Sequence, residues 1–179
     1  MEIINTQSKK QTMDIKSFYN EAFLTNIVLI GFMGSGKTTI GKLLAEELGF
    51  HFLDSDVFIA QQQGCSITEI FKNYGENFFR SLEKDFINNA SDLKSHIIAT
   101  GGGMPIFFDI NQLGKIIFLD VKFENIKLRL QKDDTRPLFN EKAYQLFQKR
   151  QKIYQKKAHI IIDANASTHQ VLKSILQSI

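Results

Sequence analysis

The sequence predicts an α/β fold in which five parallel strands form one sheet and helices cover both of its faces. Five short apolar runs recur along the chain, segments with helical spacing lie between them, and a glycine-rich loop follows the first run. Continuous apolar runs are typical of strands that are buried on both faces, and their alternation with helices favours parallel pairing.

The first expected strand is the run from Asn26 to Ile30, which ends at Gly31. Four later runs are short and apolar in the same way, and each is too short for a helix of ordinary length. We therefore expect further strands at residues 51–53, 96–99, 115–119 and 159–162.

Helices are expected between these runs. Residues 39–48 carry apolar side chains on one helical face, namely Ile40, Leu43, Leu44 and Leu48. Ser66 lies three residues before Glu69, which is the pattern of a capping box and predicts that a helix over 67–74 begins there. A helix over 75–89 is expected to bury Phe78, Phe79, Leu82 and Phe86. Three more are expected at residues 124–130, 141–156 and 168–179.

The length of 179 residues, 43% of them hydrophobic, fits one domain with one core. We assign this domain to residues 25–179 and treat the polar residues 1–24 as a flexible or helical N-terminal extension. The net charge of +3 is not carried by a basic block, and Cys65 is the single cysteine, so neither a nucleic-acid partner nor a disulfide is expected. Without a signal peptide or an apolar run of roughly 20 residues, a cytoplasmic monomer with no membrane partner is expected.

A phosphate-binding loop follows the first strand. Residues Gly31 to Thr38 read GFMGSGKT and fit the pattern G-x-x-x-x-G-K-[ST]. In this position, we expect backbone N–H groups and the helix N-terminus to hold phosphate oxygens. Lys37 would reach the β- and γ-phosphates, and the Thr38 hydroxyl would coordinate Mg²⁺. A guanine-reading Asn-Lys-x-Asp segment is absent from the sequence. A small phosphotransferase is therefore the expected class.

Two carboxylates follow the second expected strand, at Asp54 and Asp56. Ligands of open parallel sheets bind at such strand ends. Asp54 could hold a water molecule on Mg²⁺ while Asp56 accepts hydrogen bonds from a substrate hydroxyl. In the alternative interpretation, one of them caps the helix that starts near Val57, which explains one aspartate and not both.

Arginine is rare in this chain, since only four of its 22 cationic residues are arginines. A planar, bidentate donor is the particular property of arginine, and it suits the recognition of carboxylate or phosphate. Any one of the four could instead be an ordinary surface residue. They are Arg80, Arg129, Arg136 and Arg150.

Five motifs follow one another along the chain. They are Gly31–Thr38, Asp54-Ser55-Asp56, Gly75-Glu76-x-x-Phe79-Arg80-x-x-Glu83, Gly101-Gly102-Gly103 and Arg136-Pro137-Leu138. In this order they resemble the motifs of shikimate kinases. The resemblance covers residues 25–179. It implies a three-layer P-loop fold like that of nucleoside-monophosphate kinases, with a mobile lid. It also implies transfer of the γ-phosphoryl group of ATP, with Mg²⁺, to the 3-hydroxyl of shikimate in the chorismate pathway to aromatic amino acids.

The resemblance further implies roles for individual residues. Asp56 would bind the ring hydroxyls and act as the base, and Arg80 and Arg150 would hold the carboxylate of shikimate. Asp54 would act on Mg²⁺ through water. The substrate would also meet backbone N–H groups of Gly101, Gly102 and Gly103. The residues implied for the nucleotide are Gly34, Ser35, Gly36, Lys37, Thr38, Thr39, Arg129 and Arg136.

Within this set, Arg129 would stack on adenine, and Arg136, in the lid at residues 132–137, would contact both phosphate and substrate. Lys37, Asp56 and Arg136 would then be the catalytic residues. The sequence departs from the family near Arg150, where Lys152 stands in place of a frequent proline.

Two alternatives remain open at this point. Another small-molecule kinase on the same scaffold, such as a gluconate kinase, would also have a phosphate loop and acceptor-binding arginines. A non-catalytic nucleotide-binding module would keep the loop alone, and the presence of Lys37, Thr38, Asp54 and Asp56 argues against it.

Overall fold

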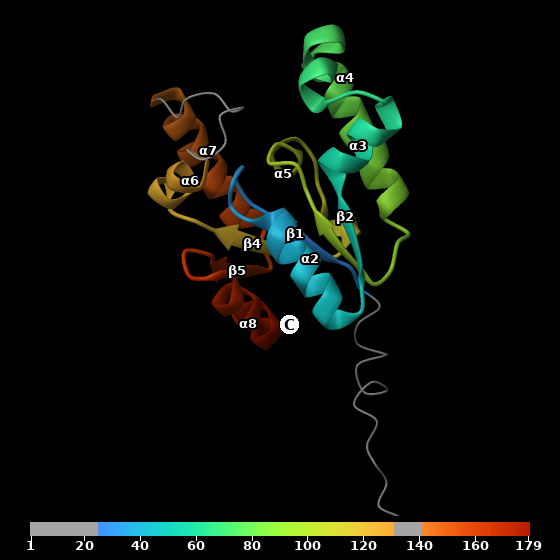
Figure 1. The fold of residues 1–179 in the computed structure, drawn as a ribbon. Coiled ribbons are helices and arrows are strands. Elements are labelled where there is room, and N and C mark those ends of the chain that lie inside the picture. Colours follow the sequence, from blue (N-terminus) through green and yellow to red (C-terminus); the bar gives the residue numbers. More distant parts are fainter. Residues whose placement is uncertain (1–24, 131–140) are drawn as a thin grey trace, which may run out of the picture.

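The structure of the chain is a computed structural model that describes residues 25–130 and 141–179. The expected extension at residues 1–24 lies outside the described residues, and so do the expected lid and Arg136. The described part of the chain forms one sheet with helices packed around it (Figure 1).

Five parallel strands form the sheet. They are β1 (Ile27–Ile30), β2 (His51–Asp54), β3 (His96–Ala99), β4 (Lys115–Asp120) and β5 (Ile160–Asp163). Their order is β2-β3-β1-β4-β5, so β1 is central, with Val28 opposite Ile98 on one side and Ile116 on the other. The expected parallel sheet is confirmed, and each expected strand agrees with the observed one to within one residue at either end.

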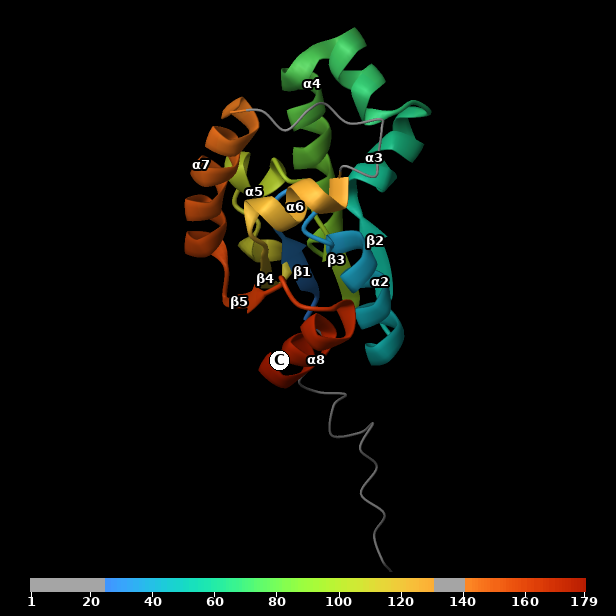
Figure 2. The same ribbon diagram turned by 60° about the vertical axis from the view of Figure 1, so that its left-hand side comes forward.

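Helices cover both faces of this sheet. They are α2 (Lys37–Leu48), α3 (Ser55–Gln63), α4 (Ile67–Ala90), α5 (Met104–Phe107), α6 (Phe123–Leu130), α7 (Glu141–Lys157) and α8 (Thr168–Ser178), with a 3₁₀ turn at Asn111–Leu113. Helices α2 and α8 pack together on one face, and α5 contacts both α4 and α7 on the other (Figure 2). This arrangement gives the expected three layers. No helix in the described ranges is long and apolar enough to cross a lipid bilayer.

The core lies on both faces of the sheet because its central strands carry apolar side chains in both directions. All four residues of β1 are buried, and Leu29, Ile98 and Ile117 expose none of their surface. The face that α2 turns inward is formed by Ile40, Gly41, Leu44 and Ala45. Leu43, which was expected to share the apolar face of this helix, lies beside the buried face and is exposed.

Helix α4 contains a break that separates the two helical segments expected from the sequence. Ser66 and Glu69 form the expected capping box, with both of its backbone hydrogen bonds. At Gly75 the backbone leaves the helical region, with φ 80° and ψ 175°. Beyond this kink Phe79 and Phe86 point into the core, whereas Phe78 pairs with the exposed ring of Tyr74 at the surface, contrary to expectation.

Candidate active site

The loop between β1 and α2 has the curled backbone that a phosphate loop requires. Gly34 and Gly36 adopt φ angles of 75° and 97°, which side chains rarely permit. The ammonium group of Lys37 lies within the curl, where Nζ donates to the carbonyl oxygens of Gly31 at 2.9 Å and Phe32 at 3.0 Å. The loop thus holds the charge of Lys37 at the carboxyl end of the central strand.

Thr38 and Asp54 are joined directly across the site. The Thr38 hydroxyl donates to Oδ2 of Asp54 at 2.8 Å. The other carboxylate oxygen caps α3, since Oδ1 accepts from the backbone N–H groups of Asp56 at 3.1 Å and Val57 at 3.3 Å. The capping alternative therefore applies to Asp54, in addition to its contact with Thr38. A hydroxyl and a carboxylate beside a phosphate loop are the oxygen ligands that Mg²⁺ prefers, so the donor set fits this ion.

A pocket of about 220 Å³ lies beside the phosphate loop. Arg129 reaches it from α6, where Nη2 donates to the carbonyl of Ala164 at 2.9 Å and Nη1 to that of Ser35 at 3.3 Å. The structure thus brings Arg129 and Thr39 to one cavity. The residues that line it are Ser35, Gly36, Thr39, Ile40, Arg129, Ala164, Ala166, Thr168 and Val171.

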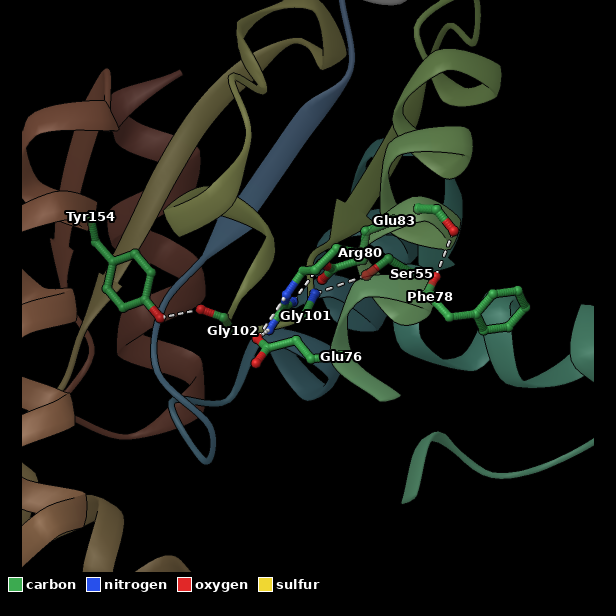
Figure 3. Close-up of polar contacts among 9 residues, drawn as sticks. Ser55, Glu76, Phe78, Arg80, Glu83, Gly101, Gly102 and Tyr154 are labelled. Atoms are coloured by element: carbon green, nitrogen blue, oxygen red, sulfur yellow. Dashed lines mark hydrogen bonds and ion pairs between the residues drawn. The ribbon is translucent and has the colours of Figure 1, made fainter. Parts of the chain in front are cut away.

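The three glycines after β3 are surrounded by the side chains expected to bind the acceptor. A Cβ atom on Gly101 would collide with the Asp56 carboxylate, and one on Gly103 would lie 2.7 Å from Nη1 of Arg80. A Cβ atom on Gly102 would approach Nη1 of Arg150 to 3.5 Å. Gly101 and Gly103 therefore leave room for the ends of the Asp56 and Arg80 side chains, and the backbone of the loop borders all three groups (Figure 3 shows the Arg80 side).

Asp56 is largely buried and has neighbouring side chains of both negative and positive charge. Its Oδ1 atom is buried and has no hydrogen-bond partner among the described residues. Burial, followed by the negative charge of Asp54, raises the pKa of the Asp56 carboxyl, while the charges of Lys37 and Arg80 oppose that rise. A carboxylate with a raised pKa and a free acceptor atom is suited to take a proton from a bound hydroxyl.

Arg80 is held by two carboxylates of its own helix (Figure 3). Its Nη2 donates to Oε1 of Glu76 at 2.8 Å, and Nη1 donates to Oε2 of Glu83. Glu83 exposes none of its surface, and its Oε1 has no hydrogen-bond partner within the described ranges. Burial raises the pKa of the Glu83 carboxyl, although the hydrogen bond and charge of Arg80 oppose the rise.

Arg150 approaches from the opposite side, on α7. Its guanidinium carbon lies 5.9 Å from the centre of the Phe32 ring. One turn further along α7, the buried hydroxyl of Tyr154 donates to the carbonyl of Gly102 at 2.6 Å (Figure 3). Burial raises the pKa of Tyr154 to about 12, against the charge of Arg150. Arg150 thus lies beside the glycine loop even though Lys152 replaces the proline frequent in the resembled family.

The comparison with protein families decides the classification. A family model described as shikimate kinase matches residues 33–179. The chain belongs to the shikimate kinase family. Curated relatives agree with this result. A shikimate kinase of Helicobacter hepaticus is 45% identical over 159 residues, which cover 86% of this chain and 95% of the relative. One of Persephonella marina is 40% identical over 160 residues, covering 86% and 98%.

Solved structures of shikimate kinases have the same fold. The enzyme of Acinetobacter baumannii in complex with shikimate aligns with a TM-score of 0.77 at 35% identity, covering 91% of this chain and 95% of the other. That of Aquifex aeolicus gives 0.76 at 36% identity, covering 86% and 95%. A gluconokinase of Sinorhizobium meliloti has a TM-score of 0.55 at 14% identity, which shows a shared fold alone. The comparisons therefore favour shikimate kinase over the gluconate kinase alternative.

Glu83 is a candidate site residue to which the sequence analysis of this shikimate kinase gave no role. Glu83 belongs to the α4 motif, but its contact with Arg80 depends on the direction in which the helix faces. A signal was present, because Glu83 lies four residues after Phe79 and three before Phe86, on the buried face of the helix. A carboxylate on an apolar face predicts a buried ion pair.

Proposed function

We propose that this chain transfers the γ-phosphoryl group of ATP to the 3-hydroxyl of shikimate. The observation that carries the proposal is the gathering of Asp56, Arg80 and Arg150 around one glycine loop, beside the Thr38 and Asp54 pair. A polyol acid needs a cationic fork for its carboxylate and an acceptor for its hydroxyl, and these residue types supply both. Membership of the shikimate kinase family supports this choice of acceptor.

On the nucleotide side, we propose that backbone N–H groups of Gly34, Ser35 and Gly36 hold the β-phosphate, with Lys37 on the β- and γ-phosphates. Lys37 would exchange its bonds to loop carbonyls for bonds to phosphate oxygens. Adenine would lie in the pocket that Arg129 and Thr39 line. Thr38, and Asp54 through water, would hold Mg²⁺, which supplies charge compensation for the phosphates.

On the acceptor side, Arg80 and Arg150 would hold the carboxylate, and the backbone of Gly101 to Gly103 would contact the ring. In the reaction, the 3-hydroxyl oxygen of shikimate forms a bond to the γ-phosphorus, and the bond from that phosphorus to the β–γ bridging oxygen breaks. The hydroxyl proton passes to Oδ1 of Asp56, and ADP leaves. Arg136, which lies outside the described residues, is proposed to stabilise the transferring phosphoryl group from a mobile lid.

We further propose that the enzyme works as a cytoplasmic monomer, without nucleic acid or a membrane. Light scattering of the purified protein, with and without both substrates, tests the monomer, and a stable dimer would contradict it.

A coupled assay of ADP release with shikimate and with gluconate tests the activity. We expect turnover with shikimate and little with gluconate, because the chain belongs to the shikimate kinase family. A preference for gluconate would favour the sugar-acid kinase alternative. Binding of ATP with no product from either acid would favour the non-catalytic module.

A further inference from the structure

Arg80 makes contact with an aromatic ring as well as with its two carboxylates. The guanidinium carbon lies 4.0 Å from the centre of the Phe107 ring. The rings of Phe79 and Phe71 are more distant, at 5.3 Å and 6.0 Å. Phe107 is 52% exposed, so its position beside Arg80 is not explained by burial in the core.

The contacts of Arg80 are of two kinds: hydrogen bonds to two carboxylates, and a contact of its guanidinium carbon with an aromatic ring. Nε and Nη2 donate to Glu76, and Nη1 donates to Glu83. A guanidinium group has five N–H bonds, so donors remain for a further carboxylate. Phe107 contributes through its ring, which attracts the cation without accepting any of these N–H bonds. A third protein carboxylate at this place would instead compete with the substrate.

Helix α5 carries Phe107 beside Arg80. Phe107 lies four residues after Gly103, one helical turn along, and Gly103 leaves the space that the Arg80 guanidinium fills. Gly103 also accepts backbone hydrogen bonds from Ile106 at 2.8 Å and Phe107 at 3.4 Å. At the end of α5, Nζ of Lys157 on α7 donates to the carbonyl of Phe108 at 2.5 Å. The backbone that follows Phe107 is therefore linked to α7, the helix that carries Arg150.

We propose that Phe107 is a positioning residue for substrate binding. Its ring fixes the plane of the Arg80 guanidinium, so that the free N–H bonds face the carboxylate of the acceptor before it arrives. This inference rests on the proposed function, because it assumes that Arg80 binds the carboxylate of shikimate. An arginine that is already oriented loses less conformational freedom when the substrate binds, and the gain appears in affinity.

Steady-state kinetics of Phe107→Leu and Phe107→Tyr test the proposal. Leucine keeps an apolar side chain of similar reach but lacks the ring. We expect Phe107→Leu to raise KM for shikimate roughly three- to tenfold, with kcat and KM for ATP unchanged. Phe107→Tyr keeps the ring and should retain the wild-type KM. Phe78→Leu is the matched control, since this phenylalanine is also exposed and its ring points away from Arg80 (Figure 3).

The outcomes separate this inference from the proposed function. If the wild-type protein does not phosphorylate shikimate, the proposed function fails and the inference with it. If the wild-type protein is active and Phe107→Leu has the wild-type KM for shikimate, the inference alone is overturned. It is also overturned if Phe107→Leu lowers kcat without changing KM, or if Phe107→Tyr is as impaired as Phe107→Leu.

Discussion

The buried position of Asp56 suits a catalytic base but is expected to lower the free energy of unfolding. Its Oδ1 atom is buried without a hydrogen-bond partner in the described part of the chain, and burial raises its pKa. We expect Asp56→Asn to lower kcat by about 10²–10⁴-fold, because asparagine cannot accept the hydroxyl proton. ATP binding, measured by calorimetry, should remain intact. A variant with nearly wild-type kcat would show that Asp56 is not the base.

The same substitution should stabilise the fold. A raised pKa means that the ionised carboxylate is less favourable in the folded than in the unfolded protein. At neutral pH, Asp56→Asn is therefore expected to increase the free energy of unfolding by about 1 kcal/mol. The gain should be full above the folded-state pKa of Asp56 and vanish as the pH falls towards the ordinary carboxyl value of 3.8. Urea unfolding at several pH values measures it, and a gain that grows towards acid would contradict this account.

Arg80→Lys tests the role of the guanidinium fork. Lysine keeps a positive charge beside the buried Glu83, which an alanine would leave without a counter-charge. It cannot offer two parallel N–H donors, so KM for shikimate is expected to rise about tenfold or more. KM for ATP serves as the internal control and should not change. An equal rise in both constants would remove Arg80 from the acceptor site.

The sequence predicted which residues belong to the candidate site better than it predicted the contacts between them. The scarcity of arginine directed attention to Arg80 and Arg150, and the structure places both beside the glycine loop. Nothing in the sequence indicated a role for Phe107, because one phenylalanine in a short segment without a helical repeat has no distinguishing pattern. Its contact with Arg80 depends on how α4 and α5 face each other, which sequence periodicity does not reveal.

At the scale of elements, the break in α4 at Gly75 positions the first part of the helix. The φ and ψ angles of Gly75 lie in a region that other residues enter at a cost of about 1–3 kcal/mol. We expect Gly75→Ala to lower the free energy of unfolding by that amount. Gly64→Ala is the matched control, because Gly64 has an ordinary left-handed conformation, with φ 67° and ψ 16°.

An added Cβ meets nothing within 4 Å at either glycine, so the comparison isolates backbone conformation. The control should lose about 1 kcal/mol. Urea unfolding measures both variants. A loss at Gly75 no larger than that at Gly64 would contradict the assigned strain.

The sequence predicted the elements whose hydrophobic pattern is long or distinct enough to recognise. The strands follow continuous apolar runs and were found to within one residue. Helix α5 has only four residues, Met104 to Phe107, too few to show a helical repeat. The kink at Gly75 was visible as a division between two expected segments, and the backbone leaves the helical region at that residue.

The molecule as a whole is expected to hold its two substrates at separable subsites. The Arg129 pocket and Lys37 lie by the phosphate loop, whereas Arg80 lies on α4 at the glycine loop. A ligand at 100 times its Kd stabilises a protein by about 2.7 kcal/mol, which thermal unfolding detects. A tenfold higher Kd leaves about 1.4 kcal/mol at the same concentration. Arg80→Lys should therefore lose about half or more of the stabilisation by shikimate and keep that by Mg²⁺–ADP. Lys37→Met should show the reverse, and loss of both effects in either variant would contradict two subsites.

The central claim is that one cavity holds the terminal phosphate of ATP next to an acid gripped by two arginines. A crystal structure of the protein with Mg²⁺, ADP and shikimate tests it most directly. We predict the shikimate carboxylate on the guanidinium groups of Arg80 and Arg150, with the 3-hydroxyl within hydrogen-bond distance of Asp56. Shikimate bound elsewhere, with the two arginines turned away from Asp56, would contradict the claim.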